Sequence, residues 1–200
     1  MRFVGIDPST KTGFVALDEN GEVVREKELT GVGSIDPRRM STLIDEIMAH
    51  VKPGDIISIE GFPYATQKAM FAGGIHHGIR NALWKRKLNY YEVAPNAVKK
   101  YVDVTGWVGE KGNKKRLKDK EKKQAVMKAV EDLYGYKHRS DNVVDAFILA
   151  QIAMDAWTYS NGIFSTLTEG YGRKNQFEVL DTLVTKKAGE IWVSNNKKTI

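Results

Sequence analysis

Residues 2–18 read RFVGIDPSTKTGFVALD, and this stretch begins a β-sheet. The apolar run at 2–7 predicts a short buried strand, and PSTKTG after it predicts a turn. Residues 14–29 predict two further strands joined at Glu19-Asn20-Gly21, because Asn-Gly is a strong hairpin signal. The chain therefore opens with the antiparallel part of a sheet.

Helical and strand-like segments alternate after this opening. Apolar residues from Met40 to Val51 recur at helical spacing after Pro37, and Pro53-Gly54 ends that helix. Residues 55–61 and 90–93 predict two more buried strands. Further helices are predicted over 75–87, 97–102, 120–134 and from Ser140 or Asp141 onward, with a Gly- and Lys-rich loop over 106–118. We expect an α/β fold with a central mixed five-stranded sheet flanked by helices.

The pattern weakens after Trp157. Residues 158–176 are rich in Gly, Ser and Thr, and strand-like pieces follow at 178–185 and 190–193. We therefore expect a domain over 1–157 and a C-terminal extension of unknown role over 158–200.

The composition of the 200 residues excludes several classes of protein. A hydrophobic fraction of 42% and a charged fraction of 28% are typical of a globular chain and not of a disordered one. The absence of cysteine excludes disulfide scaffolds, thiolate nucleophiles and cysteine-zinc sites. No apolar run approaches the ~20 residues of a transmembrane helix, and no signal-peptide core is present. We expect no membrane partner and a cytoplasmic location.

The net charge of +6 is concentrated in one segment. Residues 99–140 hold 13 Lys and Arg against 6 Asp and Glu, whereas the rest of the chain holds 18 against 19. A segregated basic stretch is typical of a protein that binds a polyanion, most often nucleic acid. A solvated helix start is the alternative. The residues predicted to contact DNA phosphates are Lys111, Lys114, Lys115, Arg116, Lys118, Lys122 and Lys123.

Acidic residues end the two buried strands at 2–7 and 55–61. Asp7 and Glu60 should emerge at the carboxyl edge of the sheet, where open α/β sheets bind ligands. Asp141 and Asp145 are four residues apart on one helix and share a face, close to Asn142. Each could instead be a turn residue, a solvated strand end or a helix cap. Asp145 is harder to dismiss, because it lies inside the apolar run VVDAFILAQIA.

A cluster of carboxylates predicts a metal site. Converging carboxylates repel one another, and Mg²⁺ or Mn²⁺ resolves that repulsion with oxygen ligands. Two such ions about 3.5–4 Å apart are the usual arrangement for in-line phosphodiester hydrolysis, and nearby lysines would neutralise the scissile phosphate.

Four ordered segments carry a resemblance to a known family. GIDPSTKTGFVALD, IEGF, the Lys-rich helix and SDNVVDAFILAQIA resemble the RuvC family of Holliday junction resolvases, and look closest to its bacteriophage-type members. The resemblance implies an RNase H-like fold, a homodimer, and Mg²⁺-dependent paired nicking of four-way DNA junctions. It assigns Asp7, Glu60 and Asp145 to the acidic ligands of the family.

The chain departs from the family at the fourth ligand. The family usually has Asp or His three residues before the last Asp, where this chain has Asn142. Either Asp141 reaches the metal or Asn142 supplies a carbonyl oxygen, and we favour Asp141. The resemblance also assigns Lys123, or else Lys122, to the lysine near the scissile phosphate.

The resemblance also points to aromatic residues after Glu60. Phe62 and Tyr64 follow it where the family has an aromatic that stacks at the junction centre; packing within a loop is the alternative. The apolar helix at 75–87 is a candidate dimer interface.

Other functions remain open at this point. The same carboxylates would serve a ribonuclease H-type enzyme or a general branched-DNA nuclease. A sugar-kinase or actin-like phosphotransferase would need a second Gly-rich phosphate loop, which this sequence lacks. A non-catalytic DNA-binding module would retain the basic segment without metal-dependent cleavage.

Overall fold

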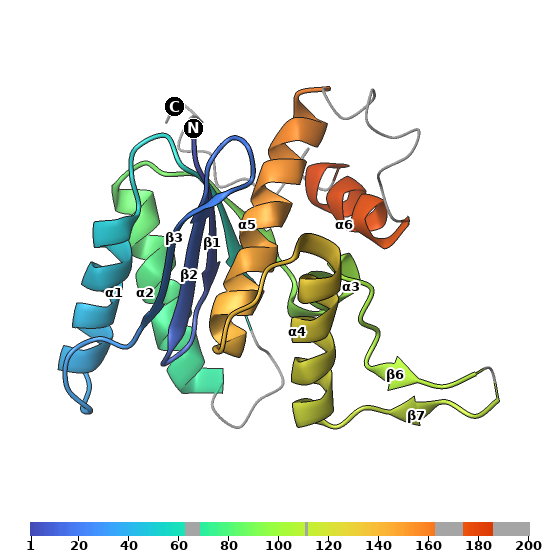
Figure 1. Cartoon of the computed structure of the whole chain (residues 1–200). Helices are drawn as coiled ribbons and strands as arrows, with labels where there is room; N and C mark the ends of the chain where they lie inside the picture. The colour runs from blue at the N-terminus through green and yellow to red at the C-terminus, as the bar shows by residue number, and fades with distance from the viewer. Residues whose placement is uncertain (63–68, 111, 163–173, 186–200) are drawn as a thin grey trace.

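A computed structural model describes residues 1–62, 69–110, 112–162 and 174–185. Its centre is a five-stranded sheet in the order β3-β2-β1-β4-β5 (Figure 1). The strands are β1 (Phe3–Asp7), β2 (Thr12–Leu17), β3 (Val23–Leu29), β4 (Ile56–Glu60) and β5 (Tyr90–Val93). β1, β2 and β3 pair antiparallel, and β1, β4 and β5 pair parallel. The predicted mixed sheet and its opening hairpin are confirmed.

Helices cover both faces of the sheet (Figure 1). On one face lie α1 (Arg38–His50) and α2 (Ala69–Lys85). On the other lies α5 (Asp141–Ser160), surrounded by α3 (Pro95–Tyr101), α4 (Asp119–Tyr134) and α6 (Lys174–Thr185). Each face of the sheet has its own hydrophobic core, and alternate residues of a strand belong to different cores. Val4 and Ile6 pack under α1 and α2, whereas Phe3 packs under α5.

Two glycines bring α5 directly onto the sheet. A Cβ at Gly5 would lie 1.9 Å from the carbonyl oxygen of Ala146, and one at Gly13 would lie 1.9 Å from that of Asn142. No larger residue fits at either position without moving the helix. The N-terminal half of α5 is therefore seated against β1 and β2, and this position brings its acidic residues to the end of β1.

Four details differ from the sequence-based expectations. The helix predicted over 75–87 begins at Ala69, and its apolar stripe of Ile75, Ile79 and Leu83 is buried on the sheet, so that stripe is not a free dimer surface. The predicted loop over 106–118 contains a hairpin, β6 (Trp107–Val108) and β7 (Lys115–Arg116).

The remaining two differences concern the C-terminal extension. Residues 178–185 are part of helix α6 and not a strand, because Val179, Leu180 and Leu183 at helical spacing pack into the core with α3 and α5. α5 itself continues to Ser160, past the boundary expected at residue 157. The strand-like piece at 190–193 lies outside the described residues.

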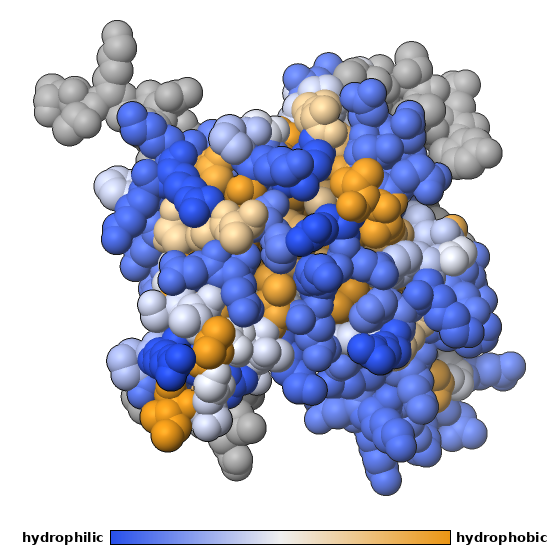
Figure 2. Space-filling view, turned by 60° about the vertical axis from the view of Figure 1, so that its left-hand side comes forward, coloured by the Kyte–Doolittle hydropathy of each residue, from blue (hydrophilic) through white to orange (hydrophobic). Residues whose placement is uncertain are grey.

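Figure 2 shows the molecule turned so that the side of α1 and α2 comes forward. Hydrophilic side chains cover most of this face, and apolar ones lie in separate groups. On α2, Phe71 and Trp84 are exposed large apolar residues. Within the described part of the chain, no helix combines the length and the apolar character that crossing a bilayer requires.

Candidate active site

Two acidic residues end neighbouring parallel strands. The register of β1 and β4 pairs Ile6 with Ile59, so that Asp7 and Glu60 follow side by side. Because side chains alternate along a strand, both carboxyls point to the face covered by α5, opposite to the face that Ile6 and Ile59 occupy. The carboxyl edge predicted from the sequence therefore holds both groups.

The Asp7 and Glu60 carboxyls are hydrogen-bonded to each other. Asp7 is buried, and burial together with the charges of Glu60 and Asp141 raises its pKa well above its ordinary value. Burial and the charge of Asp145 raise the pKa of Glu60 to about 7. Two carboxyls so close together share a proton more readily than they both ionise, with Asp7 as the donor.

α5 adds a third carboxyl to this pair. Burial and the neighbouring charge of Asp7 raise the pKa of Asp145 to about 7, against a smaller opposing effect of Lys99. One turn earlier, Asp141 acts on both Asp7 and Asp145 and forms an ion pair with Lys123 of α4. Asn142 packs its backbone against Gly13. The structure therefore brings Asp7, Glu60, Asp141 and Asp145 together from β1, β4 and α5.

Lysines border the acidic cluster. Hydrogen bonding to Asp141 raises the pKa of Lys123, which also lies within the field of Asp145 and Asp7. Lys99 of α3 lies close enough to Glu60 and Asp145 to oppose the rise of their pKa values. Sequence reasoning missed Lys99; its position in the basic helix directly after β5 was the available signal. A cleft of about 270 Å³ opens here and is lined by Lys99, Asp119, Lys122, Lys123, Val126, Met127, Asp141 and Asp145.

The donor chemistry of the cluster formed by Asp7, Glu60, Asp141 and Asp145 fits a hard divalent cation. Four carboxyls supply only oxygen ligands. Burial, followed by the charges of neighbouring carboxylates, raises the pKa of three of them, and a bound cation would favour their ionised forms. In the described residues no three acidic or histidine side chains are yet arranged around one point where an ion would sit. Asp7 is instead bonded to Glu60, and Asp141 to Lys123. Binding an ion would require these two pairs to open.

A buried arginine holds the strand end that carries Glu60. Arg80 of α2 donates from Nη2 to the Glu60 backbone carbonyl (3.0 Å) and from Nε and Nη2 to Glu92 Oε2 (3.0 and 2.9 Å). Its Nη1 lies 3.0 Å from His76 Nδ1, and its guanidinium lies 4.3 Å from the centre of the Phe62 ring. Burial, followed by the charge of Arg80, lowers the pKa of His76 to about 4. His76 is therefore neutral and accepts at Nδ1.

Of the two aromatic residues predicted to stack on DNA, the structure describes only Phe62. Phe62 stacks on His76, with ring centres 5.0 Å apart, and also contacts His77 at 4.8 Å. Phe62 therefore lies in the loop after β4 and packs against α2. Tyr64 lies outside the described residues.

Most of the basic residues predicted to contact DNA lie on or next to the β6–β7 hairpin, which projects from the body of the molecule between α3 and α4 (Figure 1). Lys114, Lys115, Arg116 and Lys118 are exposed, and Lys122 faces the cleft. Lys111 lies outside the described residues.

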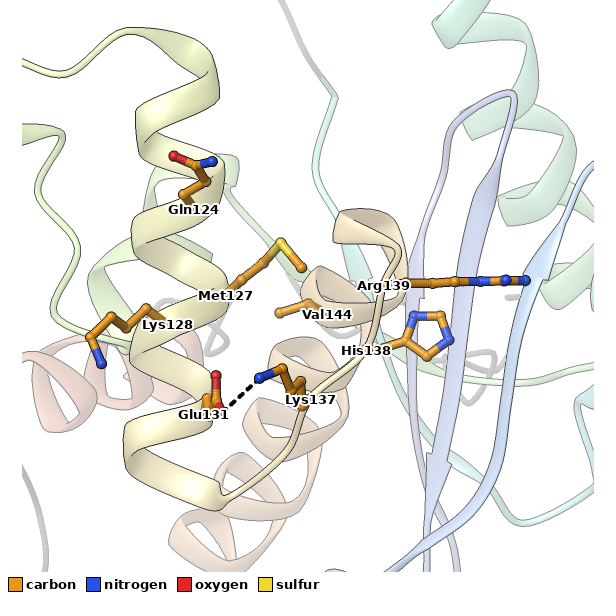
Figure 3. Close-up of a pocket in the computed structure, with 8 residues that line it drawn as sticks. All are labelled: Gln124, Met127, Lys128, Glu131, Lys137, His138, Arg139 and Val144. Atoms are coloured by element: carbon orange, nitrogen blue, oxygen red, sulfur yellow. Dashed lines mark hydrogen bonds and ion pairs between the residues drawn. The ribbon is translucent and has the colours of Figure 1, made fainter.

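A second hollow, of about 450 Å³, lies on the other side of Met127 (Figure 3). It is lined by α4, by residues 137–139 and by Val144 of α5. Lys137 bonds Glu131 across it at 3.0 Å, and Arg139 extends away from α4. None of the four clustered carboxyls lines this hollow, so it is distinct from the cleft.

The fold has counterparts among solved structures. The structure of Thermus thermophilus RuvC in complex with a Holliday junction substrate aligns with a TM-score of 0.55, covering 81% of this chain and 97% of that one at 16% identity. A second Thermus thermophilus RuvC structure aligns with a TM-score of 0.53 at 15% identity, with the same coverage. This chain has the RuvC fold. The predicted RNase H-like architecture is thereby confirmed. No protein-family model matches the chain, and no curated protein sequence matches it.

Proposed function

We propose that this protein is a divalent-metal-dependent endonuclease that resolves four-way DNA junctions. The observation that carries the proposal is the convergence of Asp7, Glu60 and Asp145 at one sheet edge, each with a raised pKa, beside Lys123. Titratable groups with strongly perturbed pKa values at a cleft are typical of functional sites. The RuvC fold, solved elsewhere with a Holliday junction, supports the choice of substrate.

Asp7, Glu60 and Asp145 are the proposed metal ligands, and Asp141 is the proposed fourth, with the Asn142 side chain as the alternative. Two bound Mg²⁺ ions, or Mn²⁺ in their place, would supply an activated water and stabilise the leaving 3′ oxygen. Ionisation of these carboxyls is required for binding, so the proton shared by Asp7 and Glu60 must leave.

The chain's own cations would act on the DNA. Lys123 is paired with Asp141 and exposed at the mouth of the cleft, from where its ammonium can turn to a scissile phosphate once Asp141 binds metal. Lys99 lies on the opposite wall and would neutralise the same strand. Both groups add charge stabilisation without taking part in proton transfer.

Paired nicking requires two such clefts, one for each continuous strand. We therefore propose that the protein acts as a homodimer, in keeping with the bacteriophage-type resemblance of its motifs. The exposed Phe71 and Trp84 of α2 are candidates for contact between the subunits, since the inner stripe of that helix is buried.

A cleavage assay tests the proposal. Labelled four-way junction, Y-fork, linear duplex and RNA–DNA hybrid are incubated with Mg²⁺, Mn²⁺ or EDTA. We expect metal-dependent, symmetric paired nicks in the junction, and Asp7→Asn protein that binds the junction but does not cut it. Equal cutting of all branched substrates would widen the function to a general branched-DNA nuclease. Cutting of the hybrid alone would indicate a ribonuclease H. Junction binding without any cutting would overturn the proposal in favour of a non-catalytic module.

A further inference from the structure

A basic groove adjoins the acidic cleft. It encloses about 410 Å³ between α3, α4 and the β6–β7 hairpin. Its lining includes Lys99, Lys100, Trp107, Arg116 and Lys122, and none of its lining residues is acidic. Lys99 and Lys122 line both the groove and the acidic cleft, so the two hollows lie next to each other and share these side chains.

The hairpin presents one aromatic and one cationic side chain to this groove. Trp107 and Arg116 are direct cross-strand partners, and both line the hollow. Cross-strand partners lie on the same face of a hairpin, roughly 5 Å apart at Cβ. Their neighbours Val108 and Lys115, the second pair, lie on the opposite face. Trp107 is 52% exposed although it belongs to a strand.

Hydrogen bonds join the two strands of the hairpin at its base. The Leu117 N–H donates to the Gly106 carbonyl (2.9 Å), and the Thr105 hydroxyl donates to the Trp107 carbonyl (3.3 Å). Gly106 has φ +75°, a backbone conformation that favours glycine. These bonds close the hairpin, and the strand pairing places Trp107 and Arg116 on the same face of it.

Four cationic side chains line the groove, and two of them are available to a ligand. Lys100 is paired with Glu178, and Lys122 with Asp119 at 3.2 Å. Lys99 and Arg116 have no ion-pair partner within the described part of the chain, and they stand on opposite walls of the groove. Unpaired cations on both walls, with an exposed tryptophan beside Arg116, match a nucleic-acid strand: phosphates would contact the cations, and a base would stack on the ring.

We propose that this groove binds a single, unpaired DNA strand as it leaves the acidic cleft, with a base stacked on Trp107 and phosphates held by Lys99 and Arg116. A single strand is required because bases inside a duplex are stacked on each other and offer no free face to an indole. The inference rests on the proposed function for its ligand. It adds a strand-binding site whose aromatic residue was not among the residues predicted from the sequence.

Equilibrium binding in EDTA tests this site without cleavage. The probes are labelled oligothymidine and a blunt duplex of the same length. Trp107→Ala should weaken oligothymidine binding by roughly 5- to 100-fold, the effect of removing one base-stacking interaction, and change duplex binding much less. Arg116→Ala should make the salt dependence for oligothymidine shallower by about 0.7 for each phosphate that the protein no longer neutralises.

Two control variants test whether the effect depends on where the removed side chain lies and not only on its chemical type. Val108→Ala removes an apolar side chain from the opposite face of the same hairpin, and Arg25→Ala removes an arginine from the far edge strand β3. Both should keep wild-type affinity for oligothymidine. Unchanged binding by Trp107→Ala, or an equal loss of affinity for the duplex, would overturn the inference.

Junction cleavage measured in parallel keeps the two proposals apart. If the wild type cleaves the junction but Trp107→Ala binds oligothymidine as well as the wild type does, the strand-binding proposal is wrong and the nuclease proposal is supported. If Trp107→Ala weakens oligothymidine binding but the wild type cleaves no junction, the nuclease proposal is wrong and the strand-binding proposal is supported.

Discussion

Arg80 donates a hydrogen bond from Nη2 to the backbone carbonyl of Glu60, 3.0 Å away. Glu60 is the last residue of β4, where the ladder to β5 ends and the chain turns away. The same guanidinium also bonds Glu92 of β5 and lies over Phe62. One buried side chain therefore fixes the strand end, the proposed metal ligand and the aromatic that follows it.

This arrangement predicts that Arg80→Lys slows junction cleavage about 10- to 100-fold, the usual cost of losing a group that orients a metal ligand. A lysine keeps the charge but cannot bond the Glu60 carbonyl, Glu92 and His76 together. Single-turnover cleavage at saturating protein measures the effect, with the junction Kd measured alongside. Arg86→Lys is the control, because Arg86 bonds only Met48 in the described structure, at the far end of α2. A weaker Kd with an unchanged cleavage rate would contradict a positioning role.

The raised pKa of Asp145 predicts a pH-dependent stability. Its pKa is about 7 in the folded protein and about 4 in the unfolded chain, so the folded state binds the extra proton between those values. The free energy of unfolding should therefore fall as the pH rises from about 4 to 7. In EDTA, Asp145→Asn should raise the Tm by a few degrees at about pH 8 and by much less at about pH 5.

Thermal melts at the two pH values measure this difference, and added Mg²⁺ should stabilise the wild type more than the variant. Asp132→Asn is the control, since Asp132 is exposed on α4 and paired only with Lys128 in the described structure. Equal pH profiles for wild type and Asp145→Asn would show that this carboxyl is not held in an unfavourable charged state.

The ion pair of Lys123 with Asp141 predicts a separate loss of activity. Lys123→Met should lower the cleavage rate by roughly 100-fold, the scale of losing one charge-stabilising group at the reacting phosphate. Lys128→Met, five residues further along α4, removes an equal charge that faces away from the cleft and should leave the rate unchanged. Rates measured at saturating Mg²⁺ distinguish this effect from altered metal affinity. Similar losses in both variants would point to a general effect of surface charge.

The sheet and the acidic cluster could be predicted because both follow from local patterns. A β-branched run that ends in Asp7, and another that ends in Glu60, give the strand ends directly. Asp145 stands out because a carboxyl inside an apolar helix needs a partner.

The contacts of Arg80 could not be predicted in the same way. An arginine within a helix is usually a surface residue, and nothing nearby in the sequence indicates that Arg80 meets Glu60 and Glu92. The position of Trp107 could not be predicted from the sequence for a different reason. A two-residue strand has too few positions to show alternation, so a Gly- and Lys-rich segment indicates only a loop.

The C-terminal extension provides the last prediction. α6 places Val179, Leu180 and Leu183 in the core shared by α3 and α5, and Leu180 is fully buried. We propose that this part of residues 158–200 is an integral layer of the domain. Leu180→Ala should then lower the free energy of unfolding by about 2–5 kcal/mol, the cost of a cavity at a buried leucine. Thr182→Ala, two residues away on the exposed side of α6, should change it by less than about 1 kcal/mol. Urea unfolding of both variants measures the difference. Because α6 lies against α3, which carries Lys99, Leu180→Ala should also weaken oligothymidine binding. A dispensable extension would show neither effect.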